Sequence, residues 1–227
     1  MLTVGAMRIA IAGGHGQVAR HLSRALTARG DVPVALVRQL RHVDDVVADG
    51  AEGVVLDLER ANARDVAEAI AGADAVVFAA GAGPGSGIDR KDTVDRAAAG
   101  LLADGAEQAG VRRYVLVSSM GAGAPPPPGT DEVFAAYLVA KRAAELDLRT
   151  RDLDWTILRP GGLTDDDPTG SVRLDDSVPR GSIPRADVAA VLVALLHEPR
   201  TAGLALELVG GVVPTDAAVA AVTERAD

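Results

Sequence analysis

The stretch MRIAIAGGHGQVAR, residues 7–20, joins a run of small apolar residues directly to a cluster of glycines. Residues 8–13 predict a buried strand, and residues 16–29 predict an amphipathic helix. Glycine loses more conformational freedom on folding than any other residue, so a cluster at this boundary needs a physical reason.

The glycines follow a G-x-x-G-x-x-A pattern made by Gly13, Gly16 and Ala19, with Gly14 inside it. A tight turn that brings backbone amides close to a phosphate at a helix N-terminus requires such small residues. The alternative is a turn that only packs tightly, but the strand before it and the helix after it favour dinucleotide binding. His15 either contacts a phosphate or has no role. No Lys-Ser/Thr pair follows, which excludes a P-loop nucleotide triphosphatase.

Short apolar runs alternate with helical stretches along the rest of the chain. The expected strands are 8–13, 33–38, 53–58, 75–81, 113–119, 154–160 and 204–210. The expected helices are 16–29, 41–49, 63–71, 89–109, 131–151, 186–197 and 215–225. The apolar runs are continuous rather than alternating, which is typical of strands covered on both faces. The pattern predicts an α/β fold with a doubly wound parallel sheet of the Rossmann type.

Two segments interrupt this alternation. Residues 121–131 contain four prolines, and residues 161–185 are rich in Gly, Pro and Asp. We expect both to be loops at the carboxyl edge of the sheet, where open α/β folds bind ligands. The prediction is one NAD(P)-binding domain over 1–227, in which residues 161–185 and 199–227 form a small C-terminal part that covers the substrate. The acidic run 165–168 is interpreted as solvated, so no metal site is predicted.

The end of the second strand indicates which dinucleotide is bound. An acid usually stands there in NAD-binding proteins, whereas this strand ends ALVR, with Arg38 in that place. A guanidinium pairs well with the 2′-phosphate of NADP, and Arg41 and His42 could add positive charge. NADP(H) is therefore favoured over NAD(H), although these residues could also be ordinary solvated basic groups. Asp57, in the following LDL, could accept a hydrogen bond from the adenine amino group.

The segment YLVAK places Tyr137 and Lys141 four residues apart, hence on one face of the helix expected over 131–151. An ammonium beside a phenol favours the phenolate. The phenol could then pass a proton to or from a substrate oxygen while hydride moves on the cofactor. Ser118 and Ser119, at the end of the fifth strand, could hold that oxygen.

These motifs resemble the short-chain dehydrogenase/reductase superfamily, in its extended and atypical branch. The group that they resemble is that of the NAD(P)-binding, NAD-dependent epimerase/dehydratase-like proteins. The segments IAGGHGQVA, ALVR, LDL, VSSMGA, YLVAK and LRPGGLTD fall in that family's order over about residues 7 to 200. The resemblance implies that Tyr137 is the catalytic acid/base and that Lys141 tunes it and contacts the ribose. It implies Ser119 as the catalytic serine, with Ser118 as the second candidate.

The resemblance also implies that the backbone around LRPG, residues 158–161, lines the nicotinamide pocket. The predicted cofactor-binding residues are Gly13, Gly14, His15, Gly16, Gln17, Val18, Arg38, Asp57, Leu58, Ala79, Ala80, Gly81, Lys141, Pro160 and Gly161.

Composition excludes several other classes of function. The formal net charge of −9 disfavours nucleic acid or an anionic membrane as a partner. There is no cysteine, and the four histidines are scattered, so thiolate chemistry and a zinc motif are excluded. No apolar run approaches the roughly 20 residues of a membrane span. The N-terminus has no secretory pattern, so we expect a cytoplasmic monomer or homodimer acting on a small molecule.

The leading functional hypothesis is an NADP(H)-dependent oxidoreductase acting on a small carbonyl or alcohol. One alternative is a non-catalytic NADP(H) sensor that reports redox state to a partner protein, which the presence of both Tyr137 and Lys141 disfavours. A further alternative is an NAD(P)-dependent epimerase or dehydratase. The chain leaves little material after residue 160 to bind a large nucleotide sugar.

Overall fold

The computed structural model describes residues 5–81, 83, 87 and 90–225. Its N-terminal elements are β1 (Arg8–Ala12), α1 (Gln17–Arg29), β2 (Val32–Val37), η1 (Leu40–His42), α2 (Val43–Ala48), β3 (Glu52–Val55), α3 (Ala63–Ala69) and β4 (Ala75–Phe78). The next elements are η2 (Lys91–Ala97), α5 (Ala98–Ala109), β5 (Arg113–Val117), α6 (Glu132–Leu148) and β6 (Asp154–Pro160). The last are β7 (Gly162–Thr164), β8 (Ser171–Asp175), β9 (Ser182–Pro184), α7 (Arg185–Leu196), η3 (Pro199–Thr201), β10 (Ala205–Gly210), β11 (Val213–Pro214) and α8 (Thr215–Glu224).

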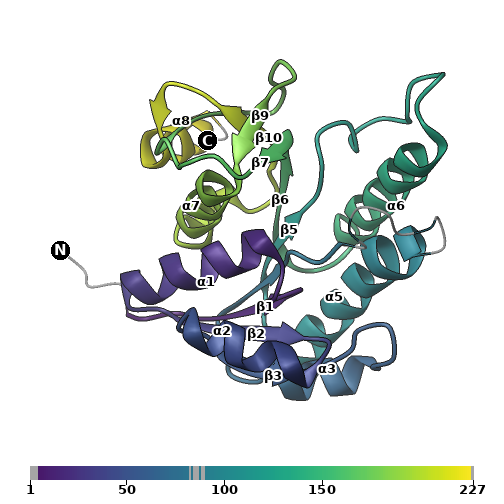
Figure 1. Ribbon diagram of the computed structural model, residues 1–227, viewed down its shortest axis with the longest axis vertical. Helices are drawn as coiled ribbons and strands as arrows, with labels where there is room; N and C mark the ends of the chain where they lie inside the picture. Colours follow the sequence, from purple (N-terminus) through teal and green to yellow (C-terminus); the bar gives the residue numbers. More distant parts are fainter. Residues whose placement is uncertain (1–4, 82, 84–86, 88–89, 226–227) are drawn as a thin grey trace.

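In the described part of the chain, nine strands form one sheet in the order β11-β8-β10-β6-β5-β4-β1-β2-β3. The seven strands from β10 to β3 are parallel to their neighbours, and the chain reverses its direction of travel across the sheet after β3. Helices α1 and α7 lie side by side on one face, and α3, α5 and α6 lie on the other (Figure 1). The predicted doubly wound α/β fold is confirmed.

Strand β1 explains why the apolar runs do not alternate. Ile9 and Ile11 pack into the core on the side of α1 and α7, whereas Ala10 and Ala12 pack on the side of α3 and α5. All four side chains are buried, so each face of this central strand must be apolar.

All seven expected strands and all seven expected helical stretches are present, with shifted ends. Strands β3 and β4 end early, at Val55 and Phe78, so LDL and AAG follow them as irregular segments. The helix expected over 89–109 has a π-helical part, η2, before α5; its expected first residue lies outside the described residues.

The expectation of one long loop over 161–185 is wrong, because β7, β8 and β9 lie within it. Strand β8 pairs antiparallel with β10 and β11, so the sheet is mixed at this edge rather than purely parallel. Strands β7 and β9 form a separate two-stranded parallel sheet. These strands are short and polar, and their partners are distant in sequence, so no continuous apolar run marks them.

A buried arginine connects the middle of the sheet to the C-terminal part. The Arg113 guanidinium donates hydrogen bonds to the Asp154 and Leu195 carbonyls and to the Thr156 and Thr201 hydroxyls, at 2.7 to 2.8 Å. Burial lowers the pKa of Arg113 to about 10, so the group is charged at neutral pH. Its charge is solvated by carbonyl and hydroxyl oxygens from β6, η3 and the last turn of α7.

Among the described residues, none of the helices is long and apolar enough to span a bilayer. In the same part of the chain, no cluster of three or more His, Cys, Asp or Glu residues could hold a metal ion.

Candidate active site and cofactor groove

The glycine loop between β1 and α1 approaches β4 too closely for side chains. Gly13 has φ of +79°, and a Cβ added there would lie 2.6 Å from the Ala80 Cα. The Gly16 amide donates to the Gly13 carbonyl at 2.8 Å, which closes the turn immediately before α1. The first turn of α1 contains no acid, so its unpaired amides present a positive end.

Gly14 has a different role, because it faces β2. Its amide donates to the Leu36 carbonyl at 3.0 Å, and a Cβ added there would lie 2.6 Å from the Ala35 Cβ. Gly14 and Gln17 line neither of the two cavities described below. The close packing of Gly14 against β2 accounts for this glycine without a ligand.

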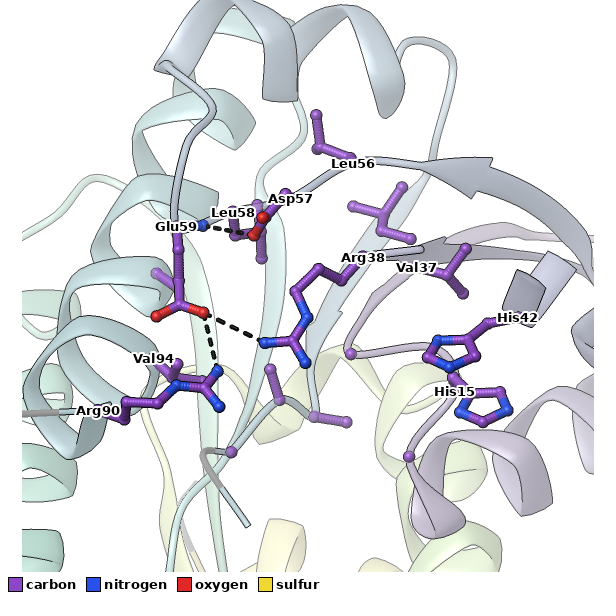
Figure 2. A pocket seen from close by; sticks show the side chains of 17 residues that line it. His15, Val37, Arg38, His42, Leu56, Asp57, Leu58, Glu59, Arg90 and Val94 are labelled. Atoms are coloured by element: carbon purple, nitrogen blue, oxygen red, sulfur yellow. Dashed lines mark hydrogen bonds and ion pairs between the residues drawn. The ribbon is translucent and has the colours of Figure 1, made fainter. Parts of the chain in front are cut away.

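A cavity of about 370 Å³, which we call the glycine-loop groove, runs over the carboxyl ends of β1 to β4 (Figure 2). It is bounded by the glycine loop, by the segments that follow β2, β3 and β4, and by Arg90 and Val94. The structure places nine of the predicted cofactor-binding residues along it: Gly13, His15, Gly16, Arg38, Asp57, Leu58, Ala79, Ala80 and Gly81.

Arg38 shares a carboxylate with a second arginine in this groove. Glu59 accepts hydrogen bonds from Arg38 at 3.4 Å and from Arg90 at 2.8 Å (Figure 2). It also accepts one from the Thr93 hydroxyl at 2.9 Å. Burial alone would raise the pKa of Glu59, but the hydrogen bonds from Thr93 and Arg90 outweigh it and hold the pKa below its ordinary value. Two guanidinium groups therefore line this end of the groove together with two carboxylates, Glu59 and Asp57.

Glu59 and Arg90 were not predicted as site residues from the sequence. Glu59 directly follows LDL and could have been considered with that motif. Arg90 reaches the groove from the start of η2, on the other side of β4 in the chain, so no local pattern marks it.

His15 and His42 stack at the opposite side of Arg38, with ring centroids 3.8 Å apart and planes within 4° (Figure 2). The His15 Nε2 lies 2.8 Å from the Asp45 carboxylate. Burial, followed by the charges of His15 and Arg41, lowers the pKa of His42, which is therefore neutral at pH 7. This shift disfavours a positive charge on His42, which lines the groove, whereas Arg41 does not line it.

A second cavity, of about 200 Å³, adjoins the groove, and we call it the Tyr137 pocket. The two cavities share the strip from Ala79 to Gly81, so they adjoin along the segment that follows β4. All four predicted catalytic residues line the Tyr137 pocket: Ser118, Ser119, Tyr137 and Lys141. The remaining lining residues are Val18, Asp95, Val117, Pro160, Gly161 and Leu163.

Helix α6 presents Tyr137, Lys141 and Glu145 at successive turns of one face. Lys141 is buried, and its Nζ lies 3.2 Å from the Asp95 carboxylate. It also donates to the Val117 carbonyl at 3.1 Å. The ion pair with Asp95 and the hydrogen bond to the carbonyl at the end of β5 therefore fix the position of Lys141. Asp95, which comes from η2, was not predicted as a site residue.

The two serines have different hydrogen-bond partners. The Ser118 hydroxyl donates to buried Glu145 at 2.5 Å, and Arg159 pairs with the same carboxylate at 2.5 and 3.0 Å. Among the residues that the structure describes, the Ser119 hydroxyl makes only a long contact, 3.5 Å, to the Met120 carbonyl. Because the proton of Ser118 is held by a carboxylate, Ser119 is the serine with a hydroxyl proton available to a ligand.

The comparison with known proteins agrees with this geometry. A family model described as NAD(P)H-binding matches residues 13–199. The chain belongs to this NAD(P)H-binding family. The match includes the glycine loop, the strip that joins the two cavities, and all of α6.

Three proteins similar to this NAD(P)H-binding protein align with it over nearly their whole length. It is 34% identical over 209 residues to YhfK of Bacillus subtilis, an uncharacterised sugar epimerase, covering 92% of this chain and 96% of that protein. A Bacillus halodurans structure provisionally named an NAD-dependent epimerase/dehydratase is 36% identical, with a TM-score of 0.89 over 96% of this chain and 100% of that one. The Lactococcus lactis oxidoreductase ylbE is 26% identical, with a TM-score of 0.85 over 96% and 97%.

These matches confirm the resemblance to atypical short-chain dehydrogenase/reductase-like proteins. The groove of this NAD(P)H-binding protein fits a nicotinamide cofactor in shape and charge. The turn at Gly13 brings the glycine loop against Ala80 and points the first amides of α1 at the groove, and two guanidinium groups line its far end. The family model does not distinguish NADP from NAD.

The contacts of Glu145 with Ser118 and Arg159 lead to a prediction about stability. Replacing Glu145 with Gln leaves the Arg159 guanidinium partly buried without its carboxylate. We expect the free energy of unfolding to fall by about 3 kcal/mol, measured by urea denaturation. Glu68→Gln is the control, because Glu68 forms an exposed pair with Arg64 on α3. A similar, small effect of both substitutions would show that the buried pair does not stabilise the protein.

Proposed function

We propose that the protein is an NADP(H)-dependent oxidoreductase that transfers hydride to or from a small carbonyl or alcohol substrate. One observation carries this proposal: the Tyr137 pocket adjoins the glycine-loop groove, and Ala79–Gly81 line both. A nicotinamide cofactor supplies the hydride when it is bound. A dinucleotide with its phosphates on the glycine loop has a continuous path from Arg38 to Tyr137.

In this proposal, Tyr137 passes a proton between its phenol and the substrate oxygen. Ser119 donates a hydrogen bond to the same oxygen, and Ser118 holds Glu145 in place. Lys141 serves as a fixed donor beside the ribose and the end of β5. The uncharged backbone at Pro160 and Gly161 borders the nicotinamide.

The C-terminal part covers the substrate side in the same proposal. Leu163 of β7 lines the Tyr137 pocket, and the Gly162 amide donates to the Gly181 carbonyl next to β9. Residues 161–185 and 199–227 would therefore bound the substrate within one NAD(P)-binding domain over 1–227. A pocket of about 200 Å³ favours a small substrate.

The preference for NADP(H) is supported by the charges around Glu59. Arg38 and Arg90 both pair with Glu59, and both guanidinium groups line the groove. A 2′-phosphate would find two charge-assisted donors there. Asp57 lines the groove beside them and is the acceptor proposed for the adenine amino group.

Replacing Arg38 with Met tests this preference. We expect NADPH affinity to fall by about 10- to 100-fold, because a charge-assisted hydrogen bond to the phosphate is lost. NADH affinity should change little, and both are measured by calorimetric titration at one salt concentration. Arg41→Met is the matched control, because Arg41 lies beside the groove without lining it. An equal loss of both affinities would contradict the assignment.

The function itself is tested by following NADPH absorbance with a panel of small aldehydes and ketones. Oxidation of NADPH in step with the appearance of an alcohol is the expected result. The names of YhfK and of the Bacillus halodurans protein favour a second candidate, an epimerase or dehydratase. Such an enzyme would retain its cofactor and would convert substrate without consuming NADPH. NADPH binding with neither activity would favour a redox sensor.

A further inference from the structure

The anion that Arg38 and Arg90 contact in the glycine-loop groove belongs to the protein itself. Both guanidinium groups reach the same carboxylate oxygen of Glu59, Oε2, from Arg38 at 3.4 Å and from Arg90 at 2.8 Å (Figure 2). Arg38 follows β2, and Arg90 stands at the N-cap of η2, so the two groups come from distant parts of the chain. Two guanidinium groups that converge on one oxygen form a site for an anion, and Glu59 occupies it.

Glu59 carries a negative charge at neutral pH. Burial raises its pKa, but the hydrogen bonds from Thr93 and Arg90 and the charges of the two arginines outweigh burial, so the pKa lies below its ordinary value. The Glu59 side chain is also less exposed than that of Arg38 or Arg90, at 27% against 47% and 41%. Solvent therefore screens this carboxylate only in part, and a second anion that approaches the two arginines meets its repulsion.

Asp57, the second carboxylate of the groove, is held by other partners. Its Oδ1 accepts a hydrogen bond from the Glu59 amide at 3.2 Å, and its Oδ2 lies 3.6 Å from the Arg60 guanidinium. Both contacts are made within the turn that follows β3. Of the two carboxylates, Glu59 is therefore the one that contacts Arg38 and Arg90.

Glu59 has room to leave the two arginines. Together with Leu58 it lines both the glycine-loop groove and a further cavity of about 600 Å³, whose other walls come from η2, α5 and α6. Thr93 and Arg96 line that cavity, and the Thr93 hydroxyl already donates to the Oε1 of Glu59 at 2.9 Å. Arg96 pairs there with Asp92. A rotation of Glu59 toward this cavity would release Oε2 from the arginines and keep the carboxylate beside a hydroxyl and a guanidinium.

We propose that Glu59 is a specificity-determining residue, which occupies the anion site of Arg38 and Arg90 and must leave it when a 2′-phosphate binds. The inference deepens the proposed function and rests on it, because it concerns the NADP(H) preference of the same groove. Displacing the carboxylate costs free energy, which lowers the affinity for NADPH. NADH has a hydroxyl in place of the phosphate and binds without displacing Glu59. The carboxylate therefore limits the preference that the two arginines create.

Replacing Glu59 with Gln tests this inference. The amide has nearly the shape of the carboxylate but no charge, so it leaves Arg38 and Arg90 available to the phosphate. We expect NADPH affinity to rise by about 10-fold, the effect of removing one partly screened like charge, and NADH affinity to change little. Both are measured by calorimetric titration at one salt concentration. Glu68→Gln is the matched control, because it removes the same charge from an exposed pair that does not line the groove.

Combining Glu59→Gln with Arg38→Met shows whether the gain in affinity depends on the arginines. In the Arg38→Met background we expect the gain for NADPH to fall to about 3-fold, because Arg90 alone of the two is released. An equal gain in both backgrounds would indicate a general effect of charge and would contradict the inference. An unchanged or lower NADPH affinity of Glu59→Gln would also overturn it, since the carboxylate would then orient the arginines. Circular dichroism verifies that each variant is folded.

The proposed function can fail separately from this inference. A gain in NADPH affinity on Glu59→Gln, in a protein that reduces no carbonyl, would refute the oxidoreductase while the role of Glu59 stands. Carbonyl reduction by Glu59→Gln with an unchanged preference between NADPH and NADH would refute the role of Glu59 alone.

Discussion

Replacing Tyr137 with Phe is expected to lower kcat/KM for carbonyl reduction by about 10²- to 10⁴-fold, the usual contribution of a general acid. The substitution removes one hydroxyl and keeps the ring that stacks on Phe134. The affinity for NADPH should not change, since no proton is transferred on binding. Steady-state kinetics and calorimetry on the same preparation separate the two quantities.

The matched control is Tyr114→Phe, which removes the same atom from the only other tyrosine. The Tyr114 hydroxyl bonds to the Ala99 carbonyl in the core, away from both cavities. We expect a loss of about 1 kcal/mol of stability and full activity. Full activity of Tyr137→Phe would instead assign the proton to another donor, with Ser119 the next to be substituted.

Replacing Gly13 with Ala is expected to abolish NADPH binding and to lower the free energy of unfolding by about 3 kcal/mol. Two effects add at this position. The φ of +79° disfavours any side chain, and the new Cβ would lie 2.6 Å from the Ala80 Cα and 2.7 Å from the Ala80 nitrogen. Backbone atoms cannot move aside as a flexible side chain can, so the loop must shift off β4. Calorimetry and urea denaturation measure the two consequences.

Gly72→Ala separates the effect of a strained backbone conformation from the effect of a close contact with neighbouring atoms. Gly72 has φ of +75°, and nothing lies within 4 Å of the place where its Cβ would be. The free energy of unfolding should fall by about 1 kcal/mol, because the backbone conformation alone disfavours the side chain, and NADPH binding should be normal. Normal NADPH binding by Gly13→Ala would mean that the loop serves packing and does not approach a phosphate.

The fold was predictable because its signals are local. A strand such as β1, apolar on both faces, can only be central in a covered sheet. The glycines that follow β1 are explained at Gly13, where a side chain would collide with the Ala80 backbone. Tyr137 and Lys141 could be paired from sequence because a helix brings residues four apart onto one face, and Glu145 could have been found by extending that spacing one turn.

The features that the sequence did not predict depend on contacts between segments that are distant in the chain. Strand β8 owes its place to antiparallel pairing with β10, which lies more than 30 residues further along the chain, and its composition resembles that of a loop. Arg90, at the N-cap of η2, and Lys91 and Asp95, within η2, reach three different partners: Glu59, the Tyr137 ring and Lys141. No spacing rule connects these residues, because the tertiary fold alone brings them together.

The buried guanidinium of Arg113 has a consequence for synthesis on the ribosome. Its strand, β5, lies at the middle of the chain, but two partners of Arg113, Leu195 and Thr201, are 82 and 88 residues further along. Until they have been translated, a charged side chain in the middle of the sheet lacks half of its solvation, and burying it is costly. The nascent chain is therefore expected to stay open at β5, and to acquire its native sheet only when translation is nearly complete.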